Sequence, residues 1–110
     1  MTDMLLVYIT TPNGDEARDI GKKMVTERLA ACANIFDGMQ SVYRWDGKLC
    51  EETESVLLLK TRQELLDALT ARVRSLHSYT TPCIVAIPVA GGDPEYLSWL
   101  GRETGNIPQR

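Results

Sequence analysis

The dipeptide Asp46-Gly47 constrains the fold of this chain more than any other feature of its sequence. Asp-Gly between two β-rich segments is the strongest short-range signal for a two-residue type I′ hairpin. The arms run over 32–45 and 48–60, and each exceeds the usual strand length of about five or six residues. Asp37-Gly38 interrupts the first arm and predicts a β-bulge that bends it. We therefore expect a long, bent two-stranded ribbon near the middle of the sequence.

The turn also predicts which residues of the ribbon share a face. It places Trp45 opposite Lys48, and directly opposed residues point to the same side. One face then carries Tyr43, Trp45, Lys48, Cys50, Glu52 and Glu54, and the other carries Val42, Arg44, Leu49, Glu51 and Thr53. Neither face is cleanly apolar, and a two-stranded ribbon is marginal alone. We expect the ribbon to project and to be stabilised by neighbouring subunits; the alternative is that it curls over its own sheet.

Hydrophobic periodicity predicts the remaining elements. We expect strands over 5–11 and 83–87, helices over 13–31 and 61–76, and a short last helix over 95–101. Asn13 precedes the first helix, Thr61 and Glu64 resemble a capping box, and Asp93 is followed by a proline at the first helical position. The order β-α-β-β-α-β plus a C-terminal helix predicts an α+β, ferredoxin-like split β-α-β sandwich. We expect a single domain that covers residues 1–110.

Composition and motifs exclude several functional classes. The net charge is −3, whereas proteins that bind a nucleic-acid backbone carry a basic surface. RNA-recognition domains share this topology, but the middle strands lack their aromatic pattern. There is no apolar run of the roughly 20 residues that span a bilayer, and no signal-peptide pattern. With one histidine, no GxSxG and no phosphate loop, we expect no enzyme activity. Three cysteines without CxxC spacing suit the cytoplasm.

Five segments match the pattern of a known family. They are Arg-Leu-Ala-Ala-Cys-Ala-Asn-Ile (28–35), Gly-Met-Gln-Ser-Val-Tyr-Arg-Trp-Asp-Gly-Lys (38–48), Leu-Leu-Lys-Thr (58–61), His-Ser-Tyr-Thr-Thr-Pro (77–82) and Gly-Asp-Pro-Glu-Tyr-Leu-Ser-Trp-Leu (92–100). The sequence thus resembles the divalent-cation tolerance (CutA) family over nearly its whole length, from Val7 to Leu100. The resemblance implies a ferredoxin-like subunit, a tight homotrimer similar in build to PII signalling proteins, and an association with tolerance of copper and other divalent cations.

The chain also departs from the family pattern. Ser78 replaces a proline, Cys83 takes an acidic position, and Cys50 stands where the family is often acidic. Ile9 and Leu76 occupy positions where some copper-binding members have cysteine and histidine. These differences weaken a direct transfer of metal ligation to this chain.

The candidate metal ligands are Cys32 and His77. Cysteine thiolate suits copper(I) or zinc, and imidazole is a common metal ligand. Cys32 could instead be a small buried apolar residue, and His77 could cap a helix end. A closed zinc site needs about three or four protein ligands, so one histidine would serve best where symmetric copies meet.

A second set of candidates would contact a small ligand: Tyr43, Trp45, Glu52, Glu54, Lys60 and Tyr79. Glu52 and Glu54 could ligate a hard cation or lie on a solvated face. Lys60 could pair with an anion or with one of these glutamates, and packing is the simpler role for Tyr79. The leading hypothesis is a trimeric, non-enzymatic, metal-responsive protein that binds divalent cations or copper. The alternative is a PII-like signalling module that binds a small anion between subunits. We expect neither nucleic acid nor membrane as a partner.

Overall fold

The computed structural model describes residues 2–105, and its elements follow the predicted order. They are β1 (Met4–Thr11), α1 (Gly14–Thr26), β2 (Cys32–Trp45), β3 (Lys48–Arg62), the single-turn η1 (Gln63–Leu65), α2 (Leu66–Leu76), β4 (Ile84–Pro88) and α3 (Pro94–Arg102). The strands pair antiparallel in the order β2-β3-β1-β4. The predicted α+β, ferredoxin-like sandwich with a long hairpin and a C-terminal helix is confirmed.

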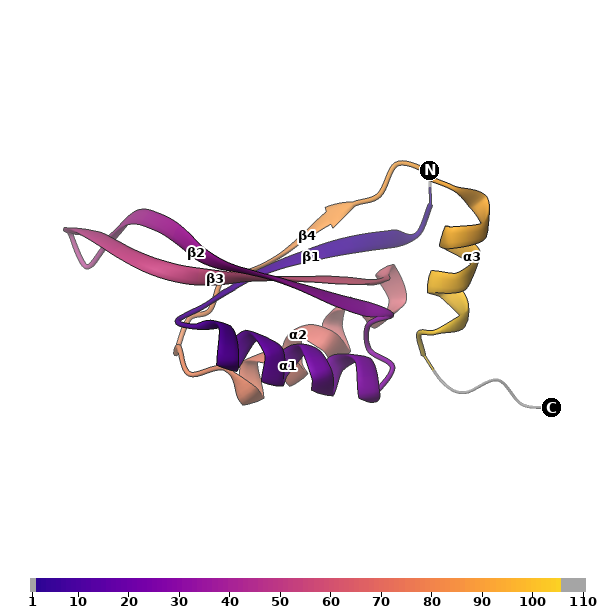
Figure 1. The fold of residues 1–110 in the computed structure, drawn as a ribbon, viewed down its shortest axis with the longest axis horizontal. Helices are drawn as coiled ribbons and strands as arrows, with labels where there is room; N and C mark the ends of the chain where they lie inside the picture. Colours follow the sequence, from indigo (N-terminus) through magenta and orange to yellow (C-terminus); the bar gives the residue numbers. More distant parts are fainter. Residues whose placement is uncertain (1, 106–110) are drawn as a thin grey trace.

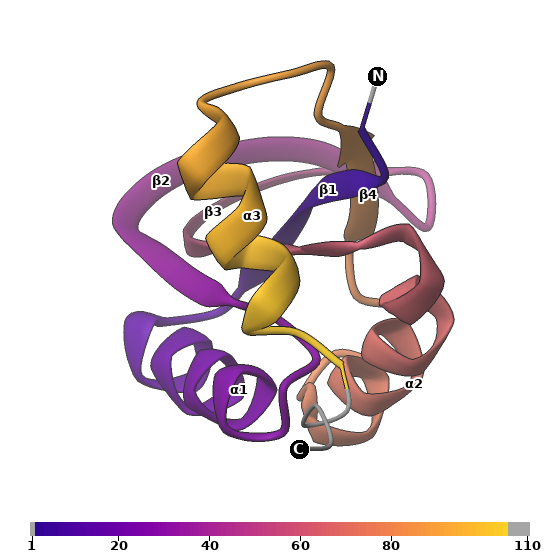
Figure 2. The ribbon, with the colours of Figure 1, turned by 90° about the vertical axis from the view of Figure 1, so that its right-hand side faces the viewer.

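The helices α1 and α2 lie side by side against one face of the sheet (Figure 1). Alternation along β1 sends Val7 and Ile9 into the core beneath them, while Tyr8 points to the opposite face. The fully buried apolar side chains of the core are Val7, Ile9, Ala17, Ile20, Met24, Ala30, Leu57, Leu59, Leu69 and Val73. The opposite face carries no such layer, and we call it the open face. Helix α3 packs at the end of the sheet that lies away from the hairpin turn (Figure 1), and it faces the viewer when the molecule is seen from that end (Figure 2).

The hairpin forms in the predicted register. Tyr43 pairs with Cys50 and Trp45 with Lys48, and the two turn residues have φ angles of 51° and 75°, as a type I′ turn requires. The register shifts between Phe36 and Met39, where Gly38 has a φ of 77°. This is the predicted bulge. Figure 1 shows the hairpin extending well past the helices, and the molecule measures 53 Å along its longest axis.

Two predictions at element ends were wrong. Helix α1 stops at Thr26 and not near residue 31, because Arg28 adopts a left-handed conformation with a φ of 62°. The Arg28 guanidinium donates to the carbonyls of Arg102 and Gly105, which holds the break in place. Thr61 does not cap a helix: it stays in β3 and its hydroxyl donates to the Leu29 carbonyl at 2.7 Å.

The other strand and helix ends lie within a few residues of their predicted positions. Strand β3 continues to Arg62, and β4 is shifted by one residue relative to 83–87. The Asn13 and Asp93 caps are confirmed, since their side chains accept the amides of Glu16 and Tyr96 at 2.8 and 2.9 Å.

A glycine sets the distance between α1 and the sheet. A Cβ atom on Gly21 would lie 2.9 Å from the Cβ of Ala33 and 3.2 Å from a methyl of Leu57. The Cβ of Ala33 cannot move aside without shifting its backbone, and the Leu57 side chain is fully buried, so little space is free around it. Helix α1 therefore approaches β2 and β3 as closely as it does because residue 21 lacks a side chain.

We expect Gly21→Ala to destabilise the fold by about 1–3 kcal/mol, the usual effect of overpacking a core. Gly101→Ala is the matched control, because that glycine is also helical and its added Cβ would meet only Met4 at 3.6 Å. The control should be neutral or stabilising by up to about 1 kcal/mol from helix propensity. Urea unfolding of both variants measures the difference, and equal stability of the two would contradict the packing argument.

Candidate functional site

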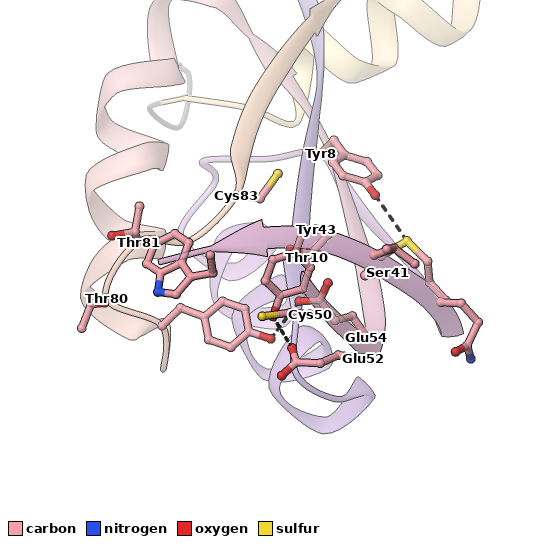
Figure 3. A pocket seen from close by; sticks show the side chains of 15 residues that line it. Tyr8, Thr10, Ser41, Tyr43, Cys50, Glu52, Glu54, Thr80, Thr81 and Cys83 are labelled. Atoms are coloured by element: carbon pink, nitrogen blue, oxygen red, sulfur yellow. Dashed lines mark hydrogen bonds between the residues drawn. The ribbon is translucent and has the colours of Figure 1, made fainter. Parts of the chain in front are cut away.

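A groove of about 800 Å³ lies on the open face, beside the hairpin. Strand β3 supplies Glu52 and Glu54, β2 supplies Tyr43, and the segment between α2 and β4 supplies Cys83 (Figure 3). Tyr79 of the same segment also lines the groove. Residues 52 and 54 share one face because strand side chains alternate. The same alternation puts them on the open face with Val56 and Leu58, and the Tyr79 hydroxyl of the α2–β4 segment contacts Glu54 there.

Two tyrosine–carboxylate hydrogen bonds occupy the groove. The Tyr43 phenol donates to Glu52 at 2.6 Å, and the Tyr79 phenol donates to Glu54 at 2.8 Å. The bond to Glu52 raises the pKa of Tyr43 to about 12. Burial, and then the bond to Glu54, raise the pKa of Tyr79. Glu54 is only 7% exposed. The hydrogen bond from the protonated Tyr79 phenol therefore offsets part of the cost of burying its carboxylate.

The charge of the groove is negative. No Lys, Arg or His is among the residues that line it, whereas two carboxylates and the thiols of Cys50 and Cys83 are. Burial, and then the charge of Glu54, raise the pKa of Cys83. An uncompensated pair of carboxylates attracts cations. Within residues 2–105, however, no three His, Cys, Asp or Glu side chains come together in a way that could hold a metal.

His77, a predicted metal ligand, is fully buried and hydrogen-bonded. Its Nε2 lies 2.8 Å from the Thr10 carbonyl, and its Nδ1 accepts the Tyr79 amide at 3.0 Å. The Nε2–H tautomer satisfies both contacts. Glu16 lies 3.4 Å from Nδ1, and its carboxylate accepts the Ser78 amide. The ring thereby fixes the segment that carries Tyr79.

Cys32, the other predicted metal ligand, lies elsewhere on the sheet. It is the first residue of β2, directly opposite Lys60 and next to α3. Its sulfur is 3.8 Å from the Tyr96 hydroxyl, to which Lys60 donates at 3.0 Å. His77 instead contacts Thr10, at the other end of β1. The structure therefore does not bring Cys32 and His77 together in one chain.

The remaining residues that were predicted to contact a ligand lie at two different ends of the open face. Trp45 is 52% exposed and lines the groove with Tyr43, Glu52, Glu54 and Tyr79, whereas Lys60 belongs to the end near α3. Tyr8, Thr10 and Cys83 also line the groove and were not predicted. The alternation of β1 could have identified Tyr8 and Thr10, because it places both opposite the buried Val7 and Ile9.

The raised pKa of Tyr43 gives a test of the groove geometry. Because the folded pKa of about 12 exceeds the ordinary value of about 10, the Tyr43–Glu52 bond stabilises the fold fully below pH 10 and is lost as the pH rises through 12. Glu52→Gln should lower the Tyr43 pKa, since a neutral amide holds the phenolic proton less strongly. Ultraviolet titration of tyrosinate, compared with Tyr43→Phe, measures it. Glu51→Gln, on the other face of the hairpin, is the control, and an unchanged titration in Glu52→Gln would contradict the assignment.

Comparison with known proteins gives consistent matches. Residues 5–103 match the family model described as CutA1 divalent ion tolerance protein. The chain is 50% identical over 100 residues to the divalent-cation tolerance protein CutA of Thermus thermophilus, covering 91% of this chain and 97% of that one. It is 43% identical over 102 residues to the chloroplastic CutA protein of Arabidopsis thaliana, covering 93% of this chain but only 56% of that protein.

Solved structures match the fold closely. The CutA1 structure from Thermus thermophilus superposes with a TM-score of 0.91 at 49% identity, covering 93% of this chain and 99% of that one. The structure described as the periplasmic divalent cation tolerance protein CutA of Archaeoglobus fulgidus gives a TM-score of 0.85 at 42% identity, with 88% and 94% covered. The family match extends over most of the sequence and includes the hairpin, the groove residues, Cys32 and α3, and so this chain belongs to the CutA1 divalent ion tolerance protein family.

Proposed function

We propose that this protein acts in divalent-cation tolerance without catalysis, as a homotrimer that binds divalent cations, copper among them, in the groove beside the hairpin. One observation carries the proposal: Glu52 and Glu54 share a groove whose lining contains no basic side chain. Their partners are neutral phenols, which orient the carboxylates without cancelling their charge.

The donor set of the groove suits divalent cations. Carboxylate oxygens are ligands for hard cations. The thiols of Cys50 and Cys83 line the same groove, but among residues 2–105 they do not join the carboxylates in a cluster of three ligands. Two carboxylates leave room for water or for groups from another subunit to complete the coordination. This arrangement would favour reversible binding, as expected of a protein that responds to metal levels.

We consider Cys32 and His77 less favourable metal ligands than the carboxylates of this groove. The Lys60 ammonium shares the Tyr96 hydroxyl with Cys32 and would repel a cation at that thiol. Coordination by His77 would require its ring to give up the contact with Thr10 or the one with Tyr79. A soft ion such as copper(I) remains the best candidate for Cys32, because thiolate prefers it.

The open face supports self-association. Phe36, Val85 and Ile87 lie on it and are 57%, 50% and 48% exposed, and the hairpin extends beyond the body of the subunit (Figure 1). Exposed apolar patches of this kind mark interaction sites. Threefold assembly, with each hairpin packed against a neighbouring sheet, would cover both features.

We propose a cytoplasmic location, because the three cysteines are free and a reducing compartment keeps them so. Of the helices described in residues 2–105, none combines the length and apolar character needed to cross a membrane. Relatives named chloroplastic and periplasmic occur, so compartment varies within the family.

A second candidate function is binding of a small anion, as in PII-like signalling modules. The observation that favours it is Lys60, which is partly buried and forms no ion pair among the described residues. Its hydrogen bond to Tyr96 raises its pKa, which keeps the ammonium charged. An anion could take the position that a carboxylate partner usually fills.

Cation binding is tested by titrating the protein calorimetrically with copper, zinc and nucleotides. Glu52→Gln combined with Glu54→Gln should weaken cation binding by about a hundredfold or more, since each of the two lost charge–ligand contacts is worth about 1.5–3 kcal/mol. The control is Glu51→Gln combined with Glu95→Gln, which removes the same charge outside the groove.

Equal affinity of the groove and control variants would contradict the groove site. Loss of copper binding in Cys32→Ser alone would transfer the site to the α3 end. Nucleotide binding that Lys60→Gln abolishes, without any cation binding, would support the anion function instead.

Self-association is tested by light scattering at micromolar concentration. We expect about three times the chain mass of 12.3 kDa, as closed threefold symmetry predicts. Ile87→Lys should dissociate the assembly by placing a charge on the open face. Val25→Lys should not, because Val25 is a similarly exposed apolar residue on α1. A folded monomer of the unmodified chain would contradict the trimer.

A further inference from the structure

A second groove, of about 620 Å³, lies at the edge of the sheet between α1, the start of β2 and α3. We call it the edge groove. Ala33 and Ile35 of β2 line it from the side of the helices, since Ala33 packs on Gly21 of α1 and Ile35 packs against the core. Figure 2 shows α1 and β2 on the side of the molecule away from α2 and β4. The edge groove is therefore separate from the open face that a trimer would cover.

The edge groove lies where the two apolar clusters of the structure meet. Ile35 packs against the large core, whereas Trp99 packs against a smaller cluster that contains Ala31 and Leu100. Ala31 and Ala33 line the space between Ile35 and Trp99, and their short side chains do not fill it. Because β2 is an edge strand, no further strand among the described residues covers this space from the side.

One face of α1 supplies the charge of the edge groove. Arg18, Lys22 and Val25 all line it, because residues three and four apart lie on the same side of a helix. Arg18 is paired with Asp15 at 2.6 Å and lies 3.9 Å from Asp37, whereas no ion pair among residues 2–105 includes Lys22. None of the described residues that line the edge groove is acidic. The Lys22 ammonium therefore lies beside an apolar surface that brings it no carboxylate partner.

The end of the edge groove nearer α3 is apolar and aromatic. Val25 is 39% exposed, and Trp99 is half-buried. The Tyr96 ring lies against Trp99 with 5.5 Å between the ring centres, which supports the indole from its own helix. Aromatic rings favour stacked or edge-to-face contact with another ring. Because α1 rises about 10 Å from Arg18 to Val25, the charged and apolar ends are separated by about the length of a small organic acid.

We propose that the edge groove binds small aromatic carboxylates, in which a short chain joins one ring to one carboxylate. The ring packs among Val25, Ile35 and Trp99, and the carboxylate accepts a charge-assisted hydrogen bond from Lys22. Small-molecule sites have this composition, a mostly apolar lining with a few polar groups that fix orientation. The inference needs neither cation binding in the groove beside the hairpin nor the trimer, so its test is separate from theirs.

The first experiment is calorimetric titration of the native assembly with 3-phenylpropionate and, separately, with the neutral alcohol 3-phenylpropanol. We expect saturable binding of the acid at one site per chain. The alcohol should bind about tenfold more weakly or worse, because it offers Lys22 no charge. Absence of saturable binding of the acid, or equal affinity of the two compounds, would overturn the proposal.

Substitutions test the role of Lys22. Lys22→Gln should weaken binding of 3-phenylpropionate by several-fold, and Lys22→Arg should retain most of it. Lys23→Gln is the matched control, because it removes the same charge from the same helix but from a side chain that is bonded to Asp19 and does not line the edge groove. Lys60→Gln, at the candidate anion site, should also leave the affinity unchanged. With folding confirmed by circular dichroism, unchanged affinity in Lys22→Gln, or an equal loss in either control, would overturn the assignment.

Tryptophan fluorescence locates the ligand, because the chain has two tryptophans, Trp45 and Trp99. They line different grooves. In Trp45→Phe, Trp99 is the only reporter, and 3-phenylpropionate should change its emission with the dissociation constant found by calorimetry. In Trp99→Phe, the emission of Trp45 should not respond. A response of Trp45 without one of Trp99 would place the ligand beside the hairpin and would overturn the site.

Discussion

The structure depends on the burial of one face of β1 and β3 beneath α1 and α2. Val7, Ile9, Leu57 and Leu59 are completely buried there, and burying a side chain of this size contributes about 1.5–3 kcal/mol. Gly21 lets α1 approach this layer closely. Because strand side chains alternate, filling one face fixes the residues of the other. The groove and the cluster of Cys32, Lys60 and Tyr96 are thus positioned by a core to which they do not belong.

The open face separates two kinds of chemistry along the same strands. Glu52 and Glu54 lie on β3 toward the hairpin, and Lys60 lies farther along the same face near α3. The intervening Val56 is buried, and Leu58 is half-buried. Opposite charges therefore remain apart within one subunit and do not neutralise each other. A carboxylate groove and the Lys60 ammonium can lie on one face of the sheet because an apolar segment separates them.

Much of this arrangement could be predicted from sequence, and the reasons are local. Asp46-Gly47 determined the register of the hairpin, and Gly38 marked the bulge, because left-handed backbone is favourable for so few residues. The strand alternation then correctly grouped Tyr43 with Glu52. Sequence could not reveal that His77 would be enclosed by Thr10 and Tyr79, or that Tyr96 would reach Lys60, because these contacts join distant elements. Thr61 failed as a cap for the same reason: the Leu29 carbonyl offered its hydroxyl a tertiary partner.

The connection between the first and last parts of the chain has a consequence for synthesis. Arg28 donates to the carbonyls of Arg102 and Gly105, Arg62 donates to Thr104, and β1 is flanked by β4. The loop that ends α1 and the strand β1 therefore have partners that are synthesised much later than they are. Local contacts can form during translation, but the sheet is complete only when β4 has left the exit tunnel. Until then the edge of β1 that β4 will cover is exposed in the nascent chain.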